Sequence, residues 1–365
     1  MKLEKGRIGL KGTVLIMIGY IYGSTAILSP GVGVGQDAWV AQTIGLGLAL
    51  IVVWVNTLLL ARFPGQTFIE INERVFGPYA GKFISLLFLW YIFHLGSIVL
   101  IDHLDFVRLM IIPLTPAEVV VFLGILPCIY AAYKGLEVIV RTGQVLVVFT
   151  LLYFGLITLF QVQSYDFANF KPFLVTPFPK LAWAGLTAAS FPYLETVVFL
   201  MILPFLNQQN KVRVAVYLGL FFGGLVVIWS IMRLILVLGD TAVNYVYPSY
   251  YAVRIINIAE LLNRFEILAA MNYIMIGFLK VTVLLYAAGL GWAQLCKCQD
   301  YRPLLLPLGA LMALVSLNNF EHVVGNFEFT TQVYSIYALP FSAGLPFLVL
   351  VGAWVRGLPG KVKNK

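Results

Sequence analysis

The chain has 365 residues, of which 61% are hydrophobic and only 11% are charged, and its formal net charge is +8. Soluble domains carry roughly 45–50% apolar and about 25% charged residues, so this composition excludes an ordinary soluble protein and indicates a polytopic membrane protein. We interpret the basic excess as a signal of membrane orientation and of attraction to anionic lipid, and not as evidence of nucleic-acid binding.

Ten segments meet the requirement of roughly 20 apolar residues for a helix that crosses a bilayer. They cover residues 12–32, 39–61, 82–107, 116–133, 138–161, 181–206, 213–238, 266–295, 303–319 and 334–355. An even number of spans places both termini on one side, and the segments on that side hold 17 of the 24 lysine and arginine residues. This excess predicts cytoplasmic N- and C-termini. Residues 1–365 are expected to form a single membrane domain.

Two spans carry helix-breaking residues near their middles. The first contains Gly19 and Gly23-Ser24-Thr25, and the sixth contains Ser190-Phe191-Pro192-Tyr193. Lipid cannot satisfy a freed backbone N–H or carbonyl, so such breaks persist only where they line a cavity or bind something. Breaks at matching positions of two halves predict a ligand site at the bilayer midplane. The expected fold is therefore an all-α membrane protein with ten transmembrane helices, arranged as a LeuT/APC-like 5+5 inverted repeat over about residues 10–161 and 178–355.

Two of the connecting segments are amphipathic. Residues 66–79 predict a short helix in the cytoplasmic interface, and residues 248–262 predict a helix on the outer face. The glycine-rich segment 31–35 follows no predicted strand, which excludes a nucleotide-binding loop and favours a flexible outer connection.

Lys280 lies near the centre of the eighth span, where a charged side chain costs roughly 3 kcal/mol. One interpretation is a cation that replaces a bound sodium ion or carries a proton, and the other is a structural pair with a carboxylate or with freed carbonyls of span one. Glu195 follows the break in span six. It is expected either to accept hydrogen bonds from freed N–H groups of the inner half of that span or to pair with a buried cation.

The remaining polar residues of the spans have simpler interpretations. Arg233 is expected to extend its charge to the outer interface or to pair with Asp240. His94 is expected to be a hydrogen-bonded core residue. Asp102, His103 and Asp105 lie together on span three, but no second acidic cluster faces them. We therefore expect neither a metal site nor a membrane enzyme, and no cofactor. The three cysteines, Cys128, Cys296 and Cys298, lack the spacing of a metal site.

Several local motifs together resemble the spore germination permease family, which contains the B subunits of nutrient germinant receptors and falls in the amino acid–polyamine–organocation superfamily. The resemblance runs over nearly the whole chain. Its motifs are Gln36-Asp37-Ala38-Trp39, Lys134-Gly135-Leu136-Glu137-Val138-Ile139-Val140-Arg141, Phe191-Pro192-Tyr193-Leu194-Glu195, Asn263-Arg264-Phe265-Glu266, Phe278-Leu279-Lys280 and Leu285-Tyr286-Ala287-Ala288-Gly289-Leu290-Gly291. At Leu194 such chains often carry a small residue, so the larger side chain here is expected to narrow the pocket.

The resemblance implies a transporter-like fold that senses a nutrient in complex with A and C subunits in the spore inner membrane. The ligand would be a small amino acid such as alanine, or a similar nutrient. Its carboxylate would meet N–H groups near Gly23, Ser24 and Thr25. Phe191 and Tyr193 would close over its apolar side. Lys280 takes the place where relatives in the superfamily hold sodium, which implies a sodium-independent mechanism.

Tyr22 is a further candidate to line the cavity. Two other functions remain open at this stage. A proton-coupled amino-acid transporter would use the same fold and the same lysine. An ion-conducting subunit of a ligand-gated assembly would open a pore once its partners are bound.

Overall fold

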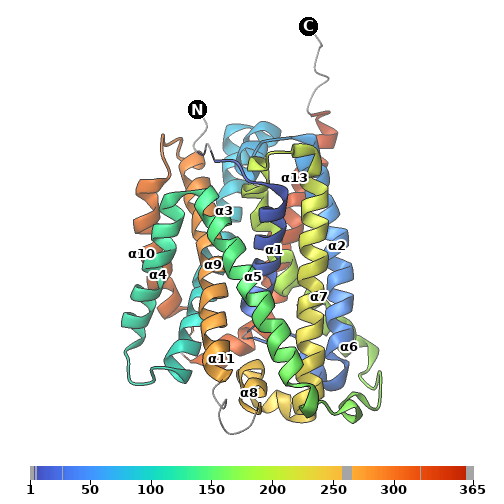
Figure 1. Cartoon of the computed structure of the whole chain (residues 1–365). Helices are drawn as coiled ribbons and strands as arrows, with labels where there is room; N and C mark the ends of the chain where they lie inside the picture. The colour runs from blue at the N-terminus through green and yellow to red at the C-terminus, as the bar shows by residue number, and fades with distance from the viewer. Residues whose placement is uncertain (1–3, 5, 27, 257–264, 321, 359–365) are drawn as a thin grey trace.

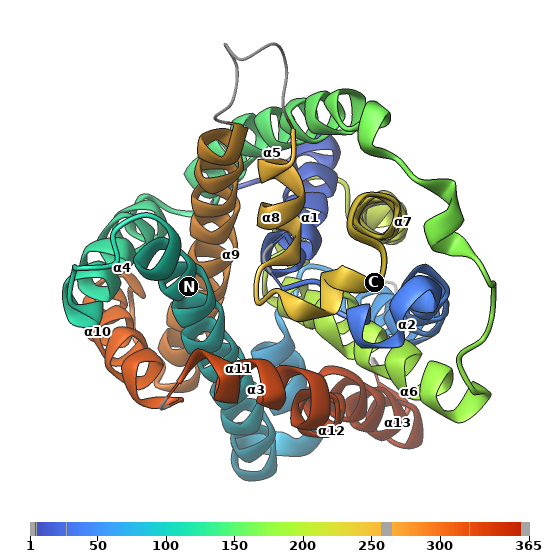
Figure 2. The ribbon, with the colours of Figure 1, turned by 90° about the horizontal axis from the view of Figure 1, so that it is seen from below.

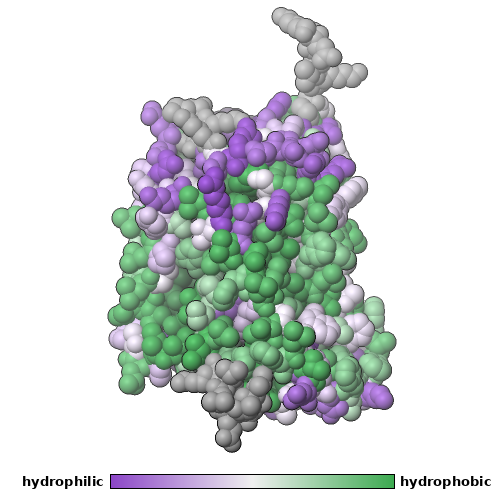
Figure 3. Space-filling view, in the orientation of Figure 1, coloured by the Kyte–Doolittle hydropathy of each residue, from purple (hydrophilic) through white to green (hydrophobic). Residues whose placement is uncertain are grey.

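The computed structural model describes residues 4, 6–26, 28–256, 265–320 and 322–358. Within these residues all regular secondary structure is helical, apart from one isolated bridge between Ile8 and Leu206. Eight helices are long and apolar enough to cross a membrane. Figure 3 shows a broad apolar belt across the middle of this face, with hydrophilic residues gathered above it and at the lower right. The chain is therefore a multi-pass membrane protein.

Helices occupy the positions of all ten predicted spans, and Figure 1 shows how they bundle. The first half contains α1 (Leu10–Thr25), α2 (Ala38–Arg62), α3 (Phe68–Met110), α4 (Ala117–Lys134) and α5 (Leu136–Phe160). The second half contains α6 (Phe178–Ala188), α7 (Val212–Leu238), α8 (Pro248–Arg254), α9 (Phe265–Leu295), α10 (Arg302–Asn318), α11 (Val323–Glu328), α12 (Tyr334–Leu339) and α13 (Leu345–Val355). The start of α1 and the end of α13 lie at the same face, as the even number of spans requires.

The predicted interfacial helix at 66–79 forms the first part of α3. Thr67 begins it with a capping box, in which the Thr67 N–H donates to Glu70 Oε2 at 2.8 Å and the Glu70 N–H donates to Thr67 Oγ1 at 3.4 Å. Gly77 has a φ of 83° and interrupts the helix before the membrane-crossing part. A left-handed conformation of this kind favours glycine, so the bend is encoded locally.

The first span differs from the prediction. The α-helix runs regularly through Gly19 and Gly23 and ends only at Thr25, and a 3-10 helix, η1 (Val32–Asp37), follows. Gly19 serves close packing instead of a break, because a β-carbon there would lie 2.3 Å from Val147 Cγ2 on α5. Small residues commonly let membrane helices approach one another in this way.

The sixth span is interrupted where the sequence predicts. After α6 comes a π-helical turn, η4 (Ala189–Tyr193), in which Phe191 has φ −129° and ψ 112°, and then a 3-10 helix, η5 (Leu194–Met201). Pro192 has no N–H to donate, which explains why the regular ladder stops here. The interrupted first and sixth spans confirm the predicted fold class.

The last span begins earlier than predicted. It starts at α11 instead of residue 334, and π-helical turns, η9 (Phe329–Val333) and η10 (Pro340–Gly344), join α11, α12 and α13.

Helix α1 lies inside the bundle and packs against α5, α7 and α9. Seen from below, α8 lies in front of α1 and between α7 and α9 (Figure 2). Residues 248–254 of the predicted outer helix are thus helical, whereas residues 257–262 and the motif residues Asn263 and Arg264 lie outside the described part of the chain.

Residues at the start of the chain pack against the adjacent end of the bundle. The N–H of Ile8 donates to the Phe205 carbonyl at 3.1 Å, and the Asn207 N–H donates to the Ile8 carbonyl at 2.9 Å. The buried Glu4 carboxylate accepts the hydroxyls of Tyr286 on α9 at 3.2 Å and of Tyr301 before α10 at 3.1 Å. This segment therefore ties the end of span six to α9 and to the start of α10.

Candidate functional site

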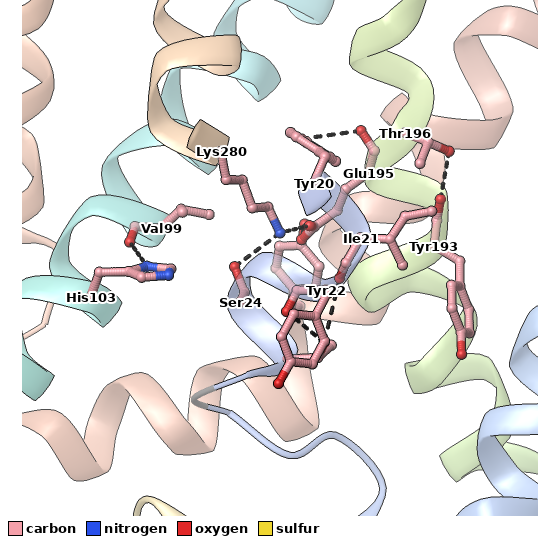
Figure 4. Close-up of polar contacts among 12 residues, drawn as sticks. Tyr20, Ile21, Tyr22, Ser24, Val99, His103, Tyr193, Glu195, Thr196 and Lys280 are labelled. Carbon is pink, nitrogen blue, oxygen red and sulfur yellow. Dashed lines mark hydrogen bonds and ion pairs between the residues drawn. The ribbon is translucent and has the colours of Figure 1, made fainter. Parts of the chain in front are cut away.

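A completely buried ion pair lies where α1 ends and span six breaks. Lys280 projects from the middle of α9, and its Nζ lies 2.5 Å from Glu195 Oε2 on η5. It also donates to Ser24 Oγ on α1 at 2.9 Å. Neither charged residue has any exposed surface. Figure 4 shows the three side chains converging from α1, α9 and η5.

Aromatic rings surround this ammonium group. Lys280 Nζ lies 5.0 Å from the centroid of the Tyr20 ring and 5.5 Å from that of Phe191. Cations are attracted to aromatic faces at such distances. The Phe191 ring in turn packs edge-on against Tyr334, at a centroid separation of 6.1 Å. The lysine is therefore held by one carboxylate, one hydroxyl and two rings.

Tyrosine hydroxyls complete the environment of Glu195. Tyr334 on α12 donates to Glu195 Oε1 at 2.6 Å, and the Tyr334 and Tyr91 hydroxyls lie 3.2 Å apart. The Tyr20 hydroxyl donates to the Glu195 carbonyl at 3.3 Å. Of the two predicted interpretations for Glu195, the structure shows pairing with a buried cation, because both carboxylate oxygens are taken by side chains and not by freed N–H groups.

The polarity of the α1 terminus differs from the prediction. The N–H groups of Gly23, Ser24 and Thr25 lie inside the regular helix, and the chain leaves the helix at its C-terminal end. The C-terminal end of a helix carries partial negative charge. This end therefore favours a ligand ammonium group, and a carboxylate would not find free N–H donors at these three residues.

Three of the six predicted ligand-binding residues lie beside Lys280. Ser24 accepts a hydrogen bond from its Nζ, the Phe191 ring faces the same nitrogen, and a β-carbon added at Gly23 would lie 3.0 Å from Lys280 Cδ. Thr25 is buried, and its hydroxyl donates to the Tyr22 carbonyl at 2.9 Å.

The other two tyrosines point elsewhere. The Tyr193 hydroxyl donates to Gln42 Oε1 on α2 at 3.1 Å, and Figure 4 shows its ring directed away from Lys280. The Tyr22 ring packs edge-on against Phe154 on α5, at a centroid separation of 5.8 Å. These two side chains lie outside the group around the ion pair.

Two residues that contribute directly were not singled out from the sequence, namely Tyr91 and Tyr334. The chain has 19 tyrosines, and neither of these lies in a distinctive motif. Only the folded arrangement of α3, η5 and α12 identifies them. The site as described is closed, because the eight predicted site residues and both tyrosines are all buried. A ligand can enter only if side chains move.

Three polar residues of α3, Asp102, His103 and Asp105, lie near its C-terminal end. Asp105 pairs with Arg108 at 3.0 Å, and Asp102 Oδ1 accepts from Asn326 Nδ2 on α11 at 2.5 Å. His103 Nδ1 donates to the Val99 carbonyl at 2.8 Å. Within the described residues, no cluster of three or more potential metal ligands occurs. His94 is hydrogen-bonded through Nδ1 to the Tyr337 hydroxyl at 2.8 Å, as predicted for a core histidine.

A family model and a curated relative both relate this chain to spore germination proteins. A family model described as "Spore germination protein" matches residues 7–322. Spore germination protein KB of Bacillus subtilis (strain 168) is 26% identical over 369 aligned residues, which cover 100% of this chain and 99% of that protein.

Solved transporters share the fold. A nucleobase-cation-symport-1 family transporter in a closed conformation with bromovinylhydantoin bound superposes with a TM-score of 0.67 and 13% identity, covering 93% of this chain and 78% of that one. The transporter MhsT in complex with L-phenylalanine gives a TM-score of 0.65 and 11% identity, covering 98% and 99% of the two chains. At such low identity these likenesses establish the architecture alone.

Proposed function

Because this chain belongs to the spore germination protein family, we propose that it is the nutrient-sensing subunit of a spore germinant receptor. Its ligand is a small amino acid or a similar nutrient, bound between the end of α1 and the break in span six. The observation that carries the proposal is the buried Lys280–Glu195 pair, which joins α9 to both interrupted spans. The role is binding and signalling, without catalysis.

The ligand binds by exchanging partners with this pair. An α-amino acid carries one carboxylate and one ammonium group, the same two charges that Glu195 and Lys280 present to each other. Its carboxylate pairs with Lys280 and its ammonium group with Glu195, beside the negative end of α1. Both protein charges then remain compensated, which matters because an unpaired buried charge is strongly destabilising. The Phe191 ring supplies an apolar wall for the ligand side chain.

Partner exchange gives the ligand a means of changing the conformation of the bundle. In the closed structure the Lys280–Glu195 pair and its hydrogen bonds to Ser24 and Tyr334 connect α1, η5, α9 and α12. A ligand that separates the pair favours any state in which these helices are less tightly joined. It shifts the equilibrium only by its difference in affinity for the two states. Germinant receptor A and C subunits in the spore inner membrane would detect that shift, with both termini of this chain in the cytoplasm.

The test is the response of spores that carry variants of this chain. Lys280→Ala should abolish germination triggered by the nutrient while leaving the protein in the membrane, as checked by immunoblotting of the membrane fraction. The matched control is Lys297→Ala, because Lys297 is an exposed cytoplasmic lysine that pairs with Glu73 at 3.5 Å. A full response of Lys280→Ala at normal ligand concentrations would refute the proposal. The ligand is identified by calorimetric screening of the purified chain against the standard amino acids.

Proton-coupled transport of the amino acid is the second candidate, favoured by the transporter fold and by a lysine within the spans. Uptake of labelled amino acid by the chain alone in liposomes, abolished by a proton ionophore, would support it over sensing. Ion conduction is the third candidate, and ligand-triggered potassium release that requires all subunits would support that role.

A further inference from the structure

A second buried cation, Arg233 on α7, lies in the outer half of the bundle. It is 3% exposed. The sequence suggested a pair with Asp240, but Asp240 is exposed on the 3-10 helix η8 (Gly239–Asn244), and within the described residues Arg233 forms no ion pair with any carboxylate. A guanidinium group stays charged in proteins, so this site holds a permanent positive charge.

Within the part of the chain that the structure describes, the partners of Arg233 are all neutral. Its Nη1 donates to Gln161 Oε1, and its Cζ lies 5.9 Å from the centroid of the Phe154 ring. Its Nε is buried and has no hydrogen-bond partner within the described residues. An arginine whose Nε is unused can still present a two-donor edge, and that edge matches a carboxylate. A buried charge compensated only by an amide and a ring is costly, so an anion that reached it would be bound favourably.

A tyrosine from another helix lies beside the same aromatic ring. The Tyr22 ring on α1 packs edge-on against Phe154, whose ring centroid also lies 5.9 Å from Arg233 Cζ. Tyrosine hydroxyls donate hydrogen bonds as readily as they accept them, so Tyr22 is a candidate donor to a bound carboxylate. The hydroxyl does not neutralise the arginine.

Gln161 connects this position to the outer face. Its Nε2 donates to the Ala252 carbonyl of α8 at 2.6 Å, while its Oε1 accepts from Arg233. Helix α8 lies beneath the end of α1 and covers this part of the bundle (Figure 2). A carboxylate on the free edge of the guanidinium neutralises the charge that Gln161 Oε1 accepts from, and so weakens the link through Gln161 to α8.

From these contacts we propose that Arg233 is the recognition residue of an outer binding site for small carboxylates. The site is distinct from the Lys280–Glu195 pair, which faces Ser24 on α1. The ligand class is a compact monocarboxylate, whether a free organic acid or the carboxylate of an amino acid. Binding at the free edge weakens the hydrogen bond between Gln161 and Arg233 and loosens the attachment of α8.

The experiment uses the purified full-length protein and a pair of probes matched in shape, sodium propionate and propionamide. Calorimetric titration should detect binding of propionate and not of the neutral amide. Arg233→Gln should weaken propionate binding by about tenfold to a hundredfold, the usual loss when a charged hydrogen-bonding partner is removed. The control is Arg254→Gln, because Arg254 is an exposed arginine on α8. It should bind propionate like the natural chain.

A second variant keeps the test decisive if Arg233→Gln fails to fold. Gln161→Glu places an internal carboxylate on the guanidinium and should abolish propionate binding in a folded protein. Titration with L-alanine and L-alaninamide then shows whether the site also binds the carboxylate of an amino acid, or only that of a free acid.

Unchanged propionate binding in Gln161→Glu, or in a folded Arg233→Gln, would overturn the proposal. So would the absence of binding to acetate, propionate, L-lactate and L-alanine by the natural chain. If the natural chain binds propionate but does not bind L-alanine, the result counts against the proposed amino-acid site at Lys280 and Glu195. It does not count against the carboxylate site at Arg233.

Discussion

Substituting Lys280 by methionine would test the buried pair directly. The change removes the ammonium group and leaves the Glu195 carboxylate with the Tyr334 hydroxyl as its side-chain partner. Because both charged residues have no exposed surface, water cannot replace the lost partner. Removing one member of a buried ion pair typically costs about 3–5 kcal/mol of stability. We expect a loss of this size for Lys280→Met.

The double variant Lys280→Met/Glu195→Gln would separate the pair from its surroundings. Replacing both members of a buried pair by neutral residues of similar volume is often neutral or stabilising. The double variant should therefore be more stable than Lys280→Met alone, with a coupling energy of about 2 kcal/mol or more. The cycle needs the unfolding free energies of the natural chain, Lys280→Met, Glu195→Gln and the double variant. Denaturant unfolding in detergent, followed by tryptophan fluorescence, measures all four. The exposed Lys297→Met serves as the control. Losses that simply add in the double variant would refute the assigned coupling.

Three further changes test the packing of α9 next to the site and the contacts of the segment at the start of the chain. Gly277→Ala would place a β-carbon 2.0 Å from His103 Cδ2 and should lower the unfolding free energy by about 1–3 kcal/mol. The control is Gly155→Ala on the exposed face of α5, where the added β-carbon meets nothing within 4 Å. This control should be neutral or slightly stabilising. Glu4→Gln should lower the melting temperature, because it weakens the acceptor for two buried tyrosine hydroxyls. Burial is the main cause that raises the pKa of Tyr301, and the Glu4 carboxylate raises it further. The protonated form of Tyr301 should therefore stabilise the fold fully below about pH 10, and this stability should be lost at higher pH. Tyr301→Phe should reduce the loss of stability at high pH.

The positions of the spans follow from hydrophobicity alone, because the bilayer requires long apolar helices whatever the packing between them. The sequence also locates the break in span six, since Pro192 acts locally on the backbone. It mislocates the break in span one. A glycine interrupts a helix or permits close helix contact depending on its neighbours, and only the structure places Val147 beside Gly19.

The site is predictable to a smaller extent. A charged residue at the depth of Lys280 is conspicuous in any sequence, and so is a glutamate beside a break. Their contact with each other depends on the packing of α9 against η5, which joins residues 85 positions apart. Tyr91 and Tyr334 are separated by 243 positions and resemble the other tyrosines in sequence. Composition and spacing carry no information about such distant pairings.

Helix α9 connects the buried ion pair to the segment at the start of the chain. Its 31 residues form one uninterrupted helix of about 46 Å, with Lys280 near the middle and the Tyr286 hydroxyl bonded to Glu4. An unbroken helix moves largely as a rigid body, so a shift of the α9 backbone at Lys280 is carried along the helix to Tyr286. A movement of α9 at the ion pair therefore also changes the contacts of Glu4, at the membrane face where the N-terminal segment lies.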